Sequence, residues 1–126
     1  MHRSRLAGFI IDCHTEDLES AAAFWSAALG LEAGKSDDKY VPLKTPDRDP
    51  YLEVQKVSHP SRVHLDIESD DVEAEVKRLE SLGAKRIDAV RTWVVMEAPD
   101  GQRFCVIRQQ NKYFDETANR WEETGV

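Results

Sequence analysis

Long apolar runs are missing from this sequence, and that absence limits where the chain can reside. None approaches membrane-spanning length, and residues 1–5 are not followed by the apolar segment that a signal peptide needs. We therefore expect a cytoplasmic protein that has no membrane partner.

Basic residues are in the minority. The 126 residues include 17 Lys and Arg against 24 Asp and Glu, which gives a net charge of −7. A surface that binds nucleic acid must be basic, so we expect no nucleic-acid partner. The charge is compatible with cationic ligands, although most acidic proteins are acidic only for solubility.

Cysteine is also scarce, with only Cys13 and Cys105 present. Both lie in strand-like segments, and in a cytosolic protein they are expected to be free thiols rather than a disulfide. The sequence has no glycine-rich phosphate loop, no paired CxxC and no nucleophile elbow, so none of these motifs indicates a function.

One stretch, residues 62–86, contains a complete strand and helix. Residues 62–68 alternate between apolar and polar side chains, as a half-buried strand does. Residues 69–71 can cap a helix, and Gly83 can end it. The apolar residues of this helix have helical spacing and predict a buried stripe of Val72, Val76, Leu79 and Leu82, with Lys77 and Arg78 on the outer face.

The same unit occurs earlier in the chain. When the sequence is shifted by 54 positions, Ile10-Ile11-Asp12 aligns with His64-Leu65-Asp66. A shift of 52 positions aligns Leu52-Glu53-Val54 with Phe104-Cys105-Val106. Two copies are too few for a solenoid, so we expect them to pair around one pseudo-symmetric site. The length suits one domain over residues 1–110, with module one at 6–57 and module two at 61–109.

The remaining elements follow from alternation and turn signals. Module one is predicted to contain a strand at 6–13, a helix that begins near Thr15 or Asp17 and ends at Gly30, and strands at 31–33, 40–44 and 51–57. Pro42 indicates an edge strand. Module two continues with strands at 84–88, 91–97 and 102–109, the last two joined by the turn sequence Pro99-Asp100-Gly101.

Residues 111–126 form a tail outside the repeat. Its apolar residues Phe114, Ala118 and Trp121 are spaced for one helical stripe. We expect this tail to dock on the domain or on a second subunit.

Strand alternation also predicts which side chains avoid the helices and could line a shared cavity. The central set is Ile10, Glu53, His64 and Cys105, with Asp12, Gln55 and Asp66 on the same faces and Tyr40, Tyr51 and Trp93 as candidate aromatic walls. His14 could reach the rim. His2 and His59 lie in segments that we expect to be flexible and receive no role.

Three interpretations of Glu53 and His64 stay open. They could be two ligands of a divalent metal, which needs three or four converging donors. They could move a proton, since a carboxylate beside an imidazole in a dry cavity can have a shifted pKa. They could also be a hydrogen-bonded pair with a structural role.

Two βαβββ modules containing the stretches VHLDIESDDVEAEVKRLESLGA and WVVMEAPDGQRFCVIR resemble the vicinal oxygen chelate superfamily, which includes glyoxalases, bleomycin-resistance proteins and extradiol dioxygenases. The resemblance covers residues 6–109 and is closest to the small glyoxalase-like proteins. It implies an α+β fold with curved mixed sheets around a cavity, and a homodimer.

The resemblance also implies where a metal would bind. Metal-dependent members carry one ligand on the first and last strand of each module, and those positions are Ile10, Glu53, His64 and Cys105 here. Ile10 cannot coordinate a metal, and cysteine stands where the metalloenzymes usually have glutamate. The resemblance therefore favours the metal-free members, which bind a drug and do no chemistry.

Three functions follow as hypotheses. The first is small-molecule binding without a full catalytic metal site. The second is a lyase or isomerase that uses Glu53 and His64, with or without a divalent metal. The third is a partner-binding module whose tail makes the contact.

Overall fold

The structure, a computed structural model, describes residues 1–122 and contains two compact units. The first unit is Gly8–His64, and the second unit comprises Met1–Ala7 and Leu65–Val126. Strands β1 (His2–His14) and β4 (Arg62–Ser69) each contribute residues to both units. No helix among the described residues has the length and apolarity to cross a membrane.

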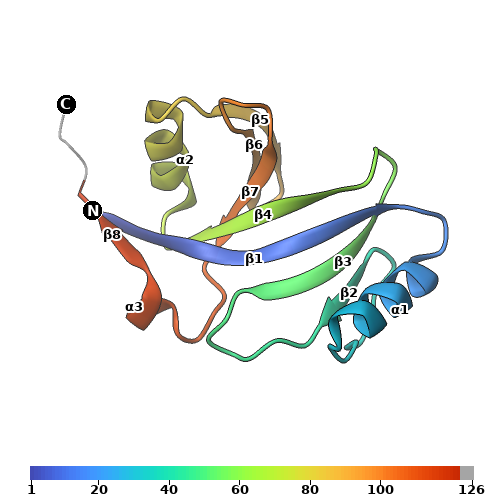
Figure 1. Ribbon diagram of the computed structural model, residues 1–126. Helices are drawn as coiled ribbons and strands as arrows, with labels where there is room; N and C mark the ends of the chain where they lie inside the picture. The colour runs from blue at the N-terminus through green and yellow to red at the C-terminus, as the bar shows by residue number, and fades with distance from the viewer. Residues whose placement is uncertain (123–126) are drawn as a thin grey trace. The chain divides into compact units, whose positions relative to one another are not determined.

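The first unit contains one helix packed on three strands. Its strands lie in the order β2 (Tyr40–Leu43), β3 (Tyr51–Val57) and β1, and helix α1 (Leu18–Leu29) contacts β2 and β3 (Figure 1). The β1–β3 pair is parallel and the β2–β3 pair antiparallel. Pro42 lies on the edge strand β2, as predicted. The strand expected at 31–33 is reduced to a single bridge between Ala33 and Leu43.

Local signals set the ends of α1. The Asp17 side chain accepts a hydrogen bond from the Ser20 backbone N–H at 3.0 Å, and Gly30 ends the helix in the left-handed conformation at φ 68°. The helix covers a core of Ala22, Val41, Leu43 and Val54, with Cys13 packed against it. Leu29, the last residue of α1, is 46% exposed.

The second unit repeats this design with a longer meander. Its strands lie in the order β4, β7 (Arg103–Arg108), β6 (Trp93–Glu97) and β5 (Lys85–Val90), and helix α2 (Val72–Ser81) packs on the last three (Figure 1). The predicted turn at Gly101 is confirmed, with φ 95°. The core consists of Val76, Leu79, Val94, Met96 and Val106. Leu82, expected in the helix stripe, is 65% exposed because α2 has already ended. The α+β class and the mixed sheets are therefore confirmed.

The register of the two units differs by two residues. The helix caps Asp17 and Asp71 are 54 positions apart, in agreement with the repeat. In the first unit Ile10 pairs with Glu53, whereas in the second unit Cys105 pairs with Asp66 rather than with His64. A shift of two residues keeps every side chain on its own face, so the sequence alternation gives no sign of it.

The tail adopts a different structure from the one expected. Helix α3 covers only Phe114–Thr117, and Asn119–Trp121 then forms strand β8, antiparallel to the start of β1 with His2 opposite Trp121. The prediction of one helical stripe through Trp121 was wrong, because the start of β1 offers a free edge whose backbone groups bind an extended segment. The tail does dock within its own unit, and its last residues, 123–126, lie outside the described part of the chain.

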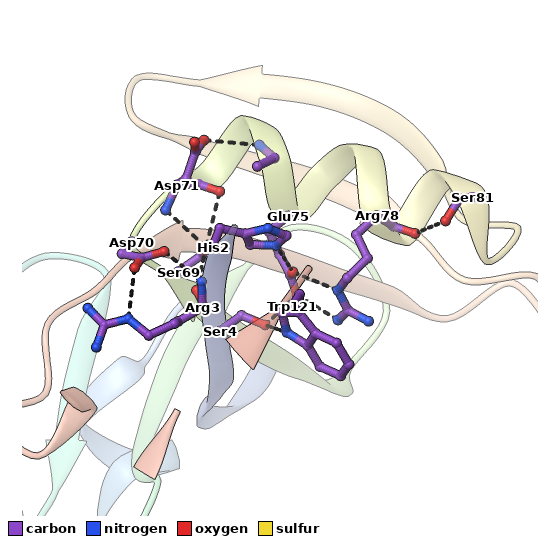
Figure 2. Close-up of polar contacts among 11 residues, drawn as sticks. His2, Arg3, Ser4, Ser69, Asp70, Asp71, Glu75, Arg78, Ser81 and Trp121 are labelled. Carbon is purple, nitrogen blue, oxygen red and sulfur yellow. Dashed lines mark hydrogen bonds and ion pairs between the residues drawn. The ribbon is translucent and has the colours of Figure 1, made fainter. Parts of the chain in front are cut away.

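A buried polar cluster joins the start of β1 to α2 (Figure 2). At its centre is the Glu75 carboxylate, which is 0% exposed. It is hydrogen-bonded to His2 Nε2 at 2.8 Å and accepts from Ser4 Oγ at 2.7 Å. It also accepts two hydrogen bonds from the Arg78 guanidinium, at 2.8 and 2.9 Å. Two expectations are corrected: His2 is buried rather than flexible, and Arg78 turns toward Glu75 rather than away from the core.

Candidate functional site

One face of the first unit is free of helix and carries most of the predicted site residues. Cys13, Leu52 and Val54 pack toward α1. Since successive side chains of a strand alternate in direction, the residues between them point to the opposite face. That face carries Ile10, Asp12, Tyr51, Glu53 and Gln55, and we call it the helix-free face of the first unit.

The strand register arranges these side chains in pairs. Ile10 lies directly opposite Glu53, and Asp12 lies opposite Gln55. The Gln55 side-chain amide donates a hydrogen bond to Tyr40 Oη at 3.0 Å, so Tyr40 belongs to the same face. The sequence therefore predicted correctly which of these residues share a face.

Asp12 is the most constrained residue on this face. It is 2% exposed, and its Oδ2 lies 2.7 Å from His64 Nδ1. Arg62 Nε and His59 Nε2 lie farther from the same oxygen, at 3.8 and 3.9 Å. The other carboxylate oxygen, Oδ1, is buried and has no hydrogen-bond partner among the described residues.

The sequence did not anticipate this arrangement. We expected His59 to be flexible and gave it no role, and Arg62 was only the start of a strand. Both lie next to Asp12 because the last residues of the first unit, 59–64, run alongside β1. The sequence gives no signal for such a contact, because the residues that meet are far apart along the chain. Asp12 and His64, for example, are 52 positions apart.

Tyr51 lies against the backbone of β1. A Cβ atom added at Gly8 would overlap the Tyr51 ring, and Gly8 pairs with Tyr51 in the β1–β3 register. Gly8 is therefore needed for this position of the Tyr51 ring on the helix-free face.

In the second unit, Asp66, Trp93 and Cys105 lie on the sheet face opposite α2. Ile67, Val94 and Phe104 pack toward the α2 side, so their strand neighbours point to the opposite face. Asp66 is buried and paired with Cys105, and Trp93 is half-buried. Both cysteines are free thiols, as predicted, and burial raises the pKa of the Cys13 thiol.

The metal implied by the fold family does not fit the residues of the first unit. Ile10 is 2% exposed, pairs with Glu53 and offers no donor atom. Of the two family positions on β1 and β3, Ile10 and Glu53, only Glu53 offers a donor atom, whereas metal-dependent members carry a ligand at both. We derive no chemical step through a metal.

Comparisons with known proteins agree with this fold. Residues 8–107 match the family described as the glyoxalase-like domain. The chain belongs to this family. It is thereby a member of the vicinal oxygen chelate superfamily, and the resemblance found in the sequence is confirmed. No curated protein matches the chain.

Several solved structures show the same architecture at low sequence identity. A hypothetical protein from Bacillus halodurans has a TM-score of 0.62 at 14% identity, covering 85% of this chain and 96% of its own. Methylmalonyl-CoA epimerase from Streptomyces coelicolor has a TM-score of 0.56 at 17% identity, covering 82% and 96%. An extradiol ring-cleaving dioxygenase from B. fuscum has a TM-score of 0.57 at 17% identity, covering 83% of this chain and 32% of its own. At these identities the likeness shows the fold alone.

Proposed function

We propose that this glyoxalase-like domain binds a small molecule on the helix-free face of the first unit, without a resident catalytic metal. The observation that carries the proposal is the buried Asp12 carboxylate, which is held by His64 through one oxygen while the other lacks a partner among the described residues. Leaving a buried acceptor without a hydrogen bond costs about 1–3 kcal/mol. A ligand that donates a hydrogen bond there would recover that free energy.

The surroundings of Asp12 favour a particular class of ligand. His64, Arg62 and His59 already lie within 4 Å of the other oxygen, at distances of 2.7, 3.8 and 3.9 Å. A cationic ligand would be repelled by Arg62, so a neutral hydroxyl or amide donor is favoured over a cation. Tyr40, Tyr51 and Gln55 are half-buried on the same face, and their side chains offer an aromatic and polar wall.

The proposal is tested by binding measurements on Asp12→Asn and on the matched control Asp38→Asn, which removes the same charge from an exposed loop. A thermal-shift panel should contain neutral polyols and amides, cationic aromatic drugs and methylmalonyl-CoA, and hits should be measured by calorimetry. We expect at least one neutral donor to bind, Asp12→Asn to weaken it by about tenfold or more, and Asp38→Asn to leave it unchanged. No binding across the panel, or equal affinities in all three proteins, would overturn the proposal.

A second candidate is favoured by the Asp12–His64 contact itself. A carboxylate at 2.7 Å from Nδ1 fixes the orientation of the imidazole and favours the tautomer with its proton on that nitrogen. An imidazole oriented in this way can act as a general acid or base, with Glu53 as the second group of a lyase or isomerase. The solved epimerase of the same fold acts on methylmalonyl-CoA, so exchange of a proton next to a carbonyl is the reaction to examine.

This second candidate requires both side chains. Methylmalonyl-CoA and simple 2-substituted thioesters should be incubated with the protein in deuterated water, and deuterium incorporation followed by NMR. Glu53→Gln and His64→Ala should each lower the exchange rate by about 100-fold or more. An exchange rate that neither substitution changes would rule out the enzyme.

A further inference from the structure

The second unit contains a shallow cavity that is separate from the helix-free face of the first unit. Its volume is about 560 Å³, and residues from the start of α2, the β5–β6 turn and the end of β7 line it. The charged residues in its lining are Asp70, Glu73, Arg91 and Arg108, and Thr92 and Gln109 add neutral hydrogen-bonding groups.

Both acidic residues of the lining are paired with arginines from outside the lining. Glu73 accepts hydrogen bonds from the Arg86 guanidinium at 2.7 and 3.2 Å, and these bonds hold the pKa of Glu73 below its usual value. Asp70 accepts from the backbone N–H and the Nε of Arg3, at 2.8 and 3.0 Å (Figure 2). Arg3 also lies 2.9 Å from Asp115 and Arg86 lies 3.6 Å from Glu80, so each arginine is shared between two carboxylates.

The two arginines of the lining have no such partners. Within residues 1–122 neither Arg91 nor Arg108 makes a side-chain hydrogen bond or an ion pair, and both are exposed. Their backbones are held in place by ordered strands. Arg108 ends β7 opposite Ser69, and Arg91 lies in the turn between the paired residues Val90 and Trp93.

We propose that this cavity binds a small molecule through an oxyanion group, a phosphate or a carboxylate. The planar guanidinium groups of Arg91 and Arg108 match oxyanions through paired N–H donors, and both acids of the lining are already engaged by other arginines. Thr92 and Gln109 can donate further hydrogen bonds to the same ligand. The protein as a whole carries a charge of −7, so long-range attraction does not account for anion binding here.

Inorganic phosphate is the first probe, and acetate at the same ionic strength is the second. Binding to the full chain is followed by calorimetry and by changes in backbone amide NMR signals. We expect phosphate to shift the signals of residues 91–92 and 108–109, and the double substitution Arg91→Gln, Arg108→Gln to weaken binding by about tenfold or more. If acetate binds and phosphate does not, the ligand group is a carboxylate.

A matched control separates this site from general charge attraction. Lys85→Gln removes one positive charge from an exposed position of β5 outside the cavity lining. The proposal would be overturned if Lys85→Gln and Arg91→Gln lowered the affinity for phosphate equally, or if neither anion bound. Because all these arginine and lysine side chains are exposed, thermal unfolding should show that each variant folds. Asp12→Asn should leave phosphate binding unchanged, so the proposal for this cavity and the proposal for the helix-free face are tested independently.

Discussion

Glu75 of α2 and His2 of β1 are separated by 73 positions and share a buried hydrogen bond of 2.8 Å. The same carboxylate binds Ser4 and Arg78, and Arg78 in turn lies over the Trp121 ring at 3.8 Å. The first strand, the second helix and the last strand of the described chain are therefore joined through one cluster of side chains around Glu75 (Figure 2). Stability should respond strongly to changes at this point.

Replacing Glu75 should destabilise the protein more than replacing an exposed glutamate of the same helix. Glu75→Gln keeps the shape but leaves Arg78 without its charged partner, and breaking a buried ion pair costs about 3–5 kcal/mol. Glu80→Gln is the control, since Glu80 is exposed on the same helix. Urea unfolding followed by circular dichroism measures both, and similar free energies of unfolding in the two variants would contradict the role of the cluster.

The Glu75 cluster should also make stability depend on acid pH. Burial alone would raise the pKa of Glu75, but the hydrogen bonds from Arg78, Ser4 and His2 outweigh it and hold the pKa below its usual value. The unfolded chain therefore binds a proton at Glu75 at a higher pH than the folded chain does. This stabilisation is complete above the ordinary carboxyl range, about pH 4–5, and is lost as the pH falls through the lowered folded-state pKa. Thermal unfolding between neutral and acid pH should show a smaller decline in Glu75→Gln than in the wild type.

Trp121 should anchor the tail by two separable contacts. Its ring lies under the Arg78 guanidinium, and its Nε1 donates a hydrogen bond to Ser4 Oγ at 2.9 Å. Trp121→Phe keeps a ring and loses the donor, at a cost of about 1 kcal/mol, whereas Trp121→Ala loses both, at a cost of about 2–4 kcal/mol. Chemical denaturation gives the two values. If Trp121→Ala costs no more than Trp121→Phe, the stacking contact contributes nothing.

Gly8→Ala should displace Tyr51. The new methyl group would overlap the ring, so either the ring or the β1 backbone must shift, at a cost of about 1–3 kcal/mol. Changes in the Tyr51 ring signals in NMR spectra would show the displacement. The second substitution Tyr51→Ala should relieve the overlap, so Gly8→Ala should cost much less in that background; an equal cost in both would place the strain elsewhere.

Ile10→His should create a metal site between β1 and β3. The new imidazole would lie opposite Glu53 in the β1–β3 register and add a second donor to this strand pair. We expect Zn²⁺ or Ni²⁺ to raise the thermal midpoint of Ile10→His more than that of the wild type, with calorimetry giving the affinities. Ile10→Leu serves as the control for repacking. Equal metal responses in the three proteins would show that Glu53 is not arranged to coordinate.

Local signals in the sequence predicted much of the first unit correctly. Asp17 caps α1, Gly30 ends it, and the 51–57 strand has the expected bounds. Each of these features depends on backbone conformation and side chains within a few positions, so a single sequence is enough to find it. Alternation along β1 and β3 also placed Ile10, Asp12, Glu53 and Gln55 on one face.

The family could likewise be predicted, because the repeat and the two motifs of module two lie in continuous stretches of sequence. The match over residues 8–107 confirms it. The roles of Glu53, His64 and the other predicted site residues stay predictions, since they depend on a ligand and not on the fold.

Outside residues 31–33 and the tail, the sequence by itself determined the order of strands and helices, the helix caps and the faces on which side chains lie. Only the tertiary structure decided that His64 binds Asp12 and that Asp66 rather than His64 pairs with Cys105. It also decided that Trp121 lies in a strand beside β1. The reason is physical: alternation and capping are local, whereas register and the partners of buried charges depend on which strand edges and polar groups remain free once distant segments have packed. A two-residue change of register leaves alternation intact, and the partner of a buried glutamate can lie 73 positions away.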